Sequence, residues 1–188
     1  MAVLLHTRSD LTLAAFERAV WRGEKVVPGP GVETTVTAMR AAFLRWYGGN
    51  GQAAVYGVTS GYGPNARQRM SEDEARAFHA KTLATGAMSF GEPLPLRVVR
   101  GILFARLANL IEGHGATSFR VVEAVIEMLN GERPVPPVPC RGTGCAGEIL
   151  PLYHLFAPLS DSFEMEIKEK GPLSNGAPCA AADRKSVV

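Results

Sequence analysis

The chain has 188 residues, of which 46% are hydrophobic and 20% are charged, and its formal net charge is +2. This composition is that of an ordinary globular protein with one core, and the mixed charge gives no reason to expect nucleic acid or a membrane as partner. No apolar run is long enough to span a membrane and residues 1–10 lack a secretion-signal pattern, so we expect a cytoplasmic protein.

Cysteine and histidine, the residue types that most often bind transition metals, are scattered along the chain. They are Cys140, Cys145, Cys179, His6, His79, His114 and His154. Their spacing matches neither a disulfide framework nor a metal-ligand motif. We therefore expect no metal site.

The first part of the chain predicts two helices with an extended piece between them. Residues Leu13–Arg22 form a short amphipathic pattern, which Ser9 or Asp10 can cap with a side-chain oxygen. Val26–Gly31 is typical of an extended segment followed by a turn. Apolar residues then recur at helical spacing over Val32–Tyr47.

The middle of the chain is rich in glycine. A short apolar run, Ala53–Tyr56, leads into the glycine-rich loop 57–64. Ser71-Glu72-Asp73-Glu74 is a capping box, which predicts a helix that begins there and continues towards Ala84. Residues Gly91–Pro95 predict a turn.

The second half predicts three further helices. Leu96–Glu112 is amphipathic, and Phe119–Leu129 ends at Asn130-Gly131, a pair that favours a left-handed cap. The proline-rich segment 134–139 is neither helix nor central strand, so we expect an extended lead-in. A last helix is predicted over Glu148–Leu159, and the whole chain is therefore mainly α with little strand.

Several collinear blocks resemble one protein family, the aromatic amino acid ammonia-lyases. They are Val55-Tyr56-Gly57-Val58-Thr59-Ser60-Gly61-Tyr62-Gly63, a block from Gly91-Glu92-Pro93-Leu94-Pro95 to Leu129-Asn130, Gly142-Thr143-Gly144-Cys145-Ala146-Gly147-Glu148-Ile149-Leu150-Pro151-Leu152, and a weaker match from Lys168-Glu169 to Leu173-Ser174-Asn175-Gly176. One glycine-rich block alone would be a weak signal, but four in order cover most of the chain.

The resemblance places the electrophile-forming tripeptide of that family at Cys145-Ala146-Gly147. The family tripeptide is usually Ala-Ser-Gly, and its serine loses a hydroxyl when the tripeptide cyclises into a methylidene-imidazolone ring. Ala146 has no hydroxyl to lose. We therefore expect no self-formed electrophile and no other cofactor in this chain.

The resemblance also implies roles for three other residues. Tyr56 matches the catalytic tyrosine that removes the β-proton of the substrate, and the alternative is that Tyr56 is a packed aromatic residue before the loop. Asn175 matches an asparagine that supports the ring and substrate, or it caps a turn. Gly86 lies at the position that selects the substrate ring, where a glycine leaves an unfilled pocket or one shaped for a different group.

Other candidate functional residues could equally have ordinary structural roles. Cys145 at a helix start could be a nucleophile, and a small buried thiol is the simpler interpretation. Arg100, Arg106 and Arg120 are more often surface or interhelix hydrogen-bonding groups than substrate clamps.

The resemblance implies the helical N-terminal region of the ammonia-lyase (fumarase/aspartase-like) fold, truncated before its central helix bundle. Residues 1–182 form the lyase-like region and 183–188 an unmatched tail. The family reaction is elimination of ammonia from an aromatic or imidazole L-amino acid, and we expect it to be impaired or diverged here. The partners implied are a small amino acid or analogue and either further copies of the chain, as a homo-oligomer, or a lyase-type partner chain.

Two alternatives remain open at this point. The chain could be a non-catalytic subunit or gene remnant that assembles with a lyase-type partner. It could also be an enzyme of altered chemistry, in which Tyr56 removes a proton while Cys145 or the loop amides handle the other half of the reaction.

Overall fold

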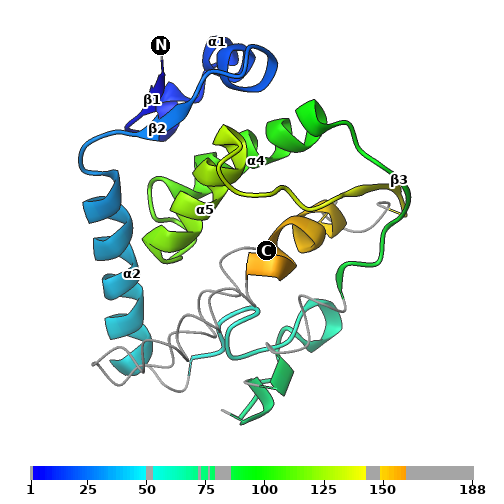
Figure 1. Ribbon diagram of the computed structural model, residues 1–188. Coiled ribbons are helices and arrows are strands. Elements are labelled where there is room, and N and C mark those ends of the chain that lie inside the picture. Colours follow the sequence, from blue (N-terminus) through cyan, green and yellow to red (C-terminus); the bar gives the residue numbers. More distant parts are fainter. Residues whose placement is uncertain are drawn as a thin grey trace.

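The computed structural model describes residues 2–49, 53–71, 73–75, 77–78, 86–142 and 149–159. Helices dominate these segments, together with two small two-stranded sheets, and this confirms the mainly α expectation (Figure 1). No helix within the described segments is both long enough and apolar enough to cross a membrane.

A small parallel sheet begins the fold. Strand β1 (Val3–Leu5) pairs with β2 (Val26–Pro28), in a register that sets Val3 opposite Val26. A parallel pair needs a crossover, and here it contains the 3-10 helix η1 (Arg8–Asp10), α1 (Leu13–Phe16) and the π-helix η2 (Glu17–Trp21). The sequence indicated the extended piece at Val26, whereas β1 was not predicted.

The predicted helix over Leu13–Arg22 is present, but its predicted cap is wrong. Thr12 is the N-cap, because its hydroxyl oxygen accepts a hydrogen bond from the Ala15 N–H at 3.1 Å. The Asp10 carboxylate instead accepts from the N–H groups of His6 and Thr7, at 2.8 and 2.9 Å. These backbone donors lower the pKa of Asp10 and fix the turn before η1.

Two helices, α4 (Leu96–Leu110) and α5 (Phe119–Asn130), pack together at the centre, and α2 (Val32–Gly49) runs along one side of them (Figure 1). The α4 face predicted from helical spacing is buried, with Val99, Leu103, Leu107 and Leu110 at 2% exposure or less. Gly131 ends α5 in the left-handed conformation, as predicted, with φ of +73°.

The last residue of α5 ties the N-terminal sheet to this core. The Asn130 side-chain oxygen accepts the N–H of Val26 at 2.8 Å, and its amide nitrogen donates to the Val26 carbonyl at 2.9 Å. The side chain thus takes the place of a neighbouring strand beside β2.

The turn predicted at Gly91–Pro95 is wrong, because residues 90–93 form a strand. Strand β3 (Phe90–Pro93) pairs antiparallel with β4 (Pro139–Arg141), with an irregular register between Phe90 and Pro93. Gly91 has φ of +90° inside this irregular pair, so its residue type reflects a kinked strand instead of a turn. Residues 134–138 before β4 are neither helix nor strand, as predicted, and Pro139 of the same proline-rich segment begins β4.

A helix over residues 150–159 confirms most of the helix predicted at Glu148–Leu159; residue 148 lies outside the described residues. Its Leu155, Phe156 and Leu159 belong to the buried core. In Figure 1 this helix lies between the α4–α5 pair and the segment that contains residues 53–78.

Candidate functional site

The loop that carries Tyr56 is folded tightly around its own backbone. The Val55 carbonyl accepts from the N–H groups of Val58, Thr59 and Ser60, at 2.9, 2.9 and 3.2 Å. The Thr59 hydroxyl accepts from Val55 N–H at 2.8 Å and donates to the Ala53 carbonyl at 2.7 Å. Thr59 and Ser60 are buried and make the loop's internal hydrogen bonds, so they hold Tyr56 in place.

Tyr56 itself projects from this loop with 61% of its surface exposed. Its hydroxyl oxygen accepts a hydrogen bond from Gly63 N–H at 3.3 Å, and its ring meets Tyr62 edge-on at 5.6 Å between centroids. Because the oxygen acts as acceptor there, the phenolic hydrogen remains available to a further acceptor. An exposed, positioned phenol fits a group that meets a ligand better than it fits a core aromatic residue.

Tyr62 packs against Tyr56 and, unlike it, is largely buried. Its ring packs against Phe78 at 5.3 Å, and burial, together with smaller contributions from Tyr153 and Tyr56, raises the pKa of Tyr62 to about 12. Tyr62 is therefore a neutral phenol at physiological pH and a poor proton acceptor. Gly57, with φ of +64°, makes room for it, because a Cβ there would lie 2.5 Å from the Tyr62 ring.

Gly86 does not open an unfilled pocket, which corrects one of the two interpretations of that position. A Cβ built on Gly86 would lie 2.5 Å from Cδ1 of Tyr153, and two further Tyr153 ring atoms are at 2.6 Å. The Tyr153 ring, 6% exposed, already fills the space of a side chain at position 86. Position 86 and the 150–159 helix therefore form one packed unit.

His154, the next residue on that helix, binds the segment that follows Gly86. Its Nε2 accepts a hydrogen bond from Ser89 N–H at 3.2 Å, which requires an unprotonated Nε2. Burial lowers the pKa of His154 in agreement with this role. Two consecutive residues of the helix thus contact the segment 86–89.

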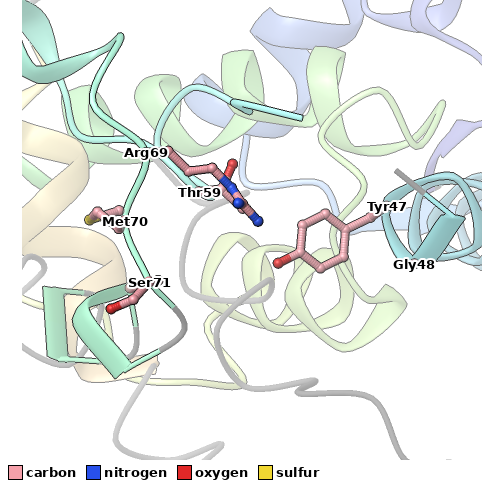
Figure 2. A pocket seen from close by; sticks show the side chains of 7 residues that line it. Tyr47, Gly48, Thr59, Arg69, Met70 and Ser71 are labelled. Carbon is pink, nitrogen blue, oxygen red and sulfur yellow. The ribbon is translucent and has the colours of Figure 1, made fainter. Parts of the chain in front are cut away.

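A cavity of about 350 Å³ lies between the end of α2 and residues 59–75. It is lined by Tyr47, Gly48, Thr59, Arg69, Met70, Ser71 and Ala75. Figure 2 shows the Arg69 side chain extending towards Tyr47, with Thr59 beside it. The Ser71 hydroxyl at its rim is committed to the predicted capping box, since it accepts from Glu74 N–H at 3.3 Å. Residues 73–75 and 77–78 are helical, as the box predicts. Tyr56 does not line this cavity.

Several predicted site residues lie outside the described residues: Cys145, Ala146, Gly147 and Asn175. Of the predicted set, the structure places Tyr56 and Gly86, and it links them through the tyrosine cluster of Tyr56, Tyr62 and Tyr153. Within the part of the chain that is described, no three His, Cys, Asp or Glu side chains gather as metal ligands would.

Sequence reasoning missed Tyr62, Phe78 and Tyr153. Tyr62 stands inside the glycine-rich block, so its position was visible but its burial was not. For Tyr153 the helical pattern carries no signal that its ring would meet a glycine so far away in the chain. Arg100 is an interhelix hydrogen-bonding group, as predicted, because it donates to the Ala19 carbonyl at 2.6 Å and joins two helices.

Comparison with known proteins gives a consistent answer. The family model described as aromatic amino acid lyase matches residues 11–183. A histidine ammonia-lyase from Deinococcus radiodurans is 31% identical over 147 residues, which cover 78% of this chain and 28% of the relative. A histidine ammonia-lyase from Streptococcus gordonii is 34% identical over 106 residues, 56% of this chain and 20% of the relative. The chain thus spans less than a third of the length of these curated relatives.

Solved structures share the fold. A tyrosine aminomutase from Streptomyces globisporus superposes with a TM-score of 0.74 at 20% identity, over 97% of this chain and 36% of that one. The ergothionase of Treponema denticola has a TM-score of 0.75 at 22% identity, over 100% and 39%. The histidine ammonia-lyase of Trypanosoma cruzi has a TM-score of 0.64 at 20% identity, over 98% and 37%. At this level of identity the likeness concerns the fold alone.

Proposed function

Because this chain belongs to the aromatic amino acid lyase family, we propose that it contains the proton-removing part of a lyase site without the self-formed electrophile. It binds an aromatic or imidazole L-amino acid or analogue, and its elimination of ammonia is lost or much weakened. The observation that carries this proposal is Ala146, which stands where the cyclising tripeptide needs a serine.

The residues of the tripeptide do not fit the methylidene-imidazolone ring. That ring needs a side-chain carbon that becomes a methylidene when a hydroxyl leaves, and the methyl group of Ala146 has no leaving group. Cys145 and Gly147 on either side do not supply a hydroxyl either. Without the ring, the substrate amine is not converted into a better leaving group. The departure of ammonia therefore lacks the electrophile that assists it in the family reaction.

The proton-removing half is supported by Tyr56. Its phenol is exposed and held by the Gly63 N–H, and the loop beneath it is fixed by the hydrogen bonds of Val55 and Thr59. The neighbouring Tyr62 keeps its proton, with a pKa of about 12, so it does not compete for the role of base.

The test compares the purified chain with Ala146→Ser. For the wild type we expect neither the ultraviolet absorbance of the imidazolone ring nor a mass deficit of two waters, and no cinnamate- or urocanate-type product. Ala146→Ser restores the hydroxyl and should show the mass deficit, whereas the control Cys145→Ala should not. Turnover of phenylalanine, tyrosine or histidine by the wild type would overturn the proposal.

A second candidate, a non-catalytic subunit that assembles with a lyase-type partner, has one observation in its favour. Large apolar side chains are strongly exposed along the described surface, among them Leu13 at 85% and Met88 at 70%. Exposed apolar surface of this kind often marks a protein contact. Sedimentation of the purified chain distinguishes the two candidates, because a stable monomer would argue against a missing partner chain.

A further inference from the structure

The cavity between the end of α2 and residues 59–75 has no part in the function proposed above, and Tyr56 does not line it. Its volume of about 350 Å³ lies in the range of cavities that hold small organic molecules. Among the described residues that line it, Arg69 is the charged one. The Tyr47 ring and the Met70 side chain contribute apolar surface, so the lining combines a cationic part with an apolar part.

The backbone that carries Arg69 is fixed to the Tyr56 loop. Met70 N–H donates to the Thr59 carbonyl at 2.7 Å, and Ser60 pairs with Arg69 in an isolated antiparallel bridge. Thr59 and Ser60 are buried. From this anchored backbone the Arg69 side chain extends towards Tyr47, whose hydroxyl end faces it (Figure 2).

The other polar side chains of the described lining are already engaged. The Thr59 hydroxyl makes two hydrogen bonds within its own loop. The Ser71 hydroxyl accepts from Glu74 N–H at 3.3 Å and donates to the Glu74 carboxylate at 2.9 Å. A guanidinium has five N–H donors, enough for a ligand beside its contacts within the protein, and a phenol has one. Arg69 and Tyr47 are therefore the side chains that offer donors to a ligand.

The charges around the cavity favour a ligand with a single negative charge. The planar donors of Arg69 match a carboxylate in charge and in geometry. Gly48 has no side chain, so the backbone of the last turn of α2 lines the cavity, and the end of a helix carries partial negative charge. The Glu74 carboxylate, held by Ser71, lies beside the rim. These negative groups disfavour a phosphate, which carries more charge than a carboxylate.

We propose that this cavity binds a small organic carboxylate with an apolar body. The carboxylate accepts hydrogen bonds from the Arg69 guanidinium and the Tyr47 hydroxyl, and the apolar body lies against Met70 and Ala75. Because Tyr56 does not line the cavity, this inference does not rest on the proposed function.

Benzoate is the probe, since it joins one carboxylate to an apolar ring. Its binding to the full chain is measured by calorimetry or ligand-observed NMR, beside that of benzamide, which has the same ring without the charge, and of inorganic phosphate. We expect benzamide and phosphate to bind at least about fivefold more weakly than benzoate, which is the scale of one exposed ion pair.

Four variants locate the bound probe. Arg69→Gln should weaken benzoate binding by at least about fivefold, and Tyr47→Phe by about threefold through the loss of one hydrogen bond. Arg67→Gln is the matched control, because it removes the same charge from an exposed residue two positions away that is not among the described lining residues. It should leave the affinity within about twofold, and so should Tyr56→Phe.

Each other outcome contradicts the inference. It is overturned if benzoate does not bind, if benzamide or phosphate binds as tightly, or if Arg67→Gln weakens binding as much as Arg69→Gln. Loss of benzoate binding in Tyr56→Phe would place the probe at Tyr56 and would also overturn it. The comparison of benzoate with benzamide and phosphate uses the wild type, so it remains decisive even where a variant fails to fold. None of these results tests Ala146, so the proposed function is judged separately by product formation.

Discussion

At the scale of single residues, the absence of a side chain at one position can be compensated from another element. Gly86 lacks a side chain, and the Tyr153 ring occupies the vacated space with 6% exposure. A glycine in this setting is required by close packing and not by backbone conformation, because its φ is not in the left-handed region.

We therefore predict that Gly86→Ala destabilises the chain by about 1–3 kcal/mol, the usual cost of overpacking a well-filled site. The matched control is Gly48→Ala in α2, where an added Cβ meets nothing within 4 Å. That control should stabilise by about 0.5 kcal/mol through helix propensity. Urea unfolding of both variants measures the difference, and equal stability of the two would show that the Tyr153 ring moves aside freely.

His154 makes a pH-dependent contribution to stability whose sign follows from its environment. Burial lowers the pKa of His154, so the unfolded chain, where the pKa is about 6.5, binds the proton more readily than the folded chain. The contribution is complete above the unfolded pKa, and it is lost as the pH falls below about 6.5 towards the lowered folded pKa. Protonation would also remove the acceptor for Ser89 N–H.

We predict that His154→Gln, which retains an acceptor without titrating, flattens the stability profile between about pH 7.5 and pH 5.5. The wild type should lose stability over the same interval, as measured by urea unfolding at each pH. His114, an exposed residue beside Glu112, provides the control through His114→Gln, which should leave the wild-type slope in place. A wild-type slope that survives in His154→Gln would contradict the assignment.

How far single residues could be predicted depended on whether their role is local. Tyr56 was singled out from the block around it, and its exposure and its contact with Gly63 arise within that block, while its catalytic role stays a prediction. Tyr153 was not predicted, because its role comes from a contact across the fold with Gly86. A pattern along one helix indicates which face is buried but not which ring fills which gap.

At the scale of elements, the long helices were predictable and the short strands were not. Helices α2, α4 and α5 have enough turns for their apolar spacing to be visible, and their bounds differ from the prediction by only one or two residues. Strands β1, β3 and β4 have three or four residues each, which is too few for an alternating pattern. Their pairing partners are distant in sequence, so tertiary contacts decide their structure.

Helix capping shows the same limit, and it yields a sharp test. Ser9, Asp10 and Thr12 are all residue types that cap helices, and only the geometry shows that Thr12 accepts the Ala15 N–H. We predict that Thr12→Ala destabilises the chain by about 1 kcal/mol and that Ser9→Ala changes stability by less than about 0.5 kcal/mol. Thermal unfolding distinguishes the pair, and a larger cost for Ser9→Ala would restore the cap predicted from the sequence.

At the scale of the whole molecule, the core is substantial but the surface is unusually apolar in places. Trp21, at 61% exposure, is covered in part by the Arg97 guanidinium at 4.9 Å from its ring centre. Leu96, directly before Arg97, is 60% exposed. This Trp21–Arg97–Leu96 surface joins η2 to the start of α4, two elements that pack against one another.

Because exposed apolar surface favours association, we predict that the isolated chain self-associates. Its weight-average sedimentation coefficient should rise with protein concentration. The variant Trp21→Gln/Leu96→Gln reduces the apolar area on the Trp21–Arg97–Leu96 surface. It should weaken the association by about tenfold or more, because burial of one large apolar side chain contributes about 1.5–3 kcal/mol and a tenfold change corresponds to about 1.4 kcal/mol. Leu4→Gln, on the exposed side of β1, is the control for any exposed apolar residue and should have a smaller effect.

A sedimentation coefficient that stays at the monomer value over the whole concentration range would contradict self-association. It would also argue against a non-catalytic subunit that assembles with a lyase-type partner, because the monomer would then be stable with its apolar surface exposed to water.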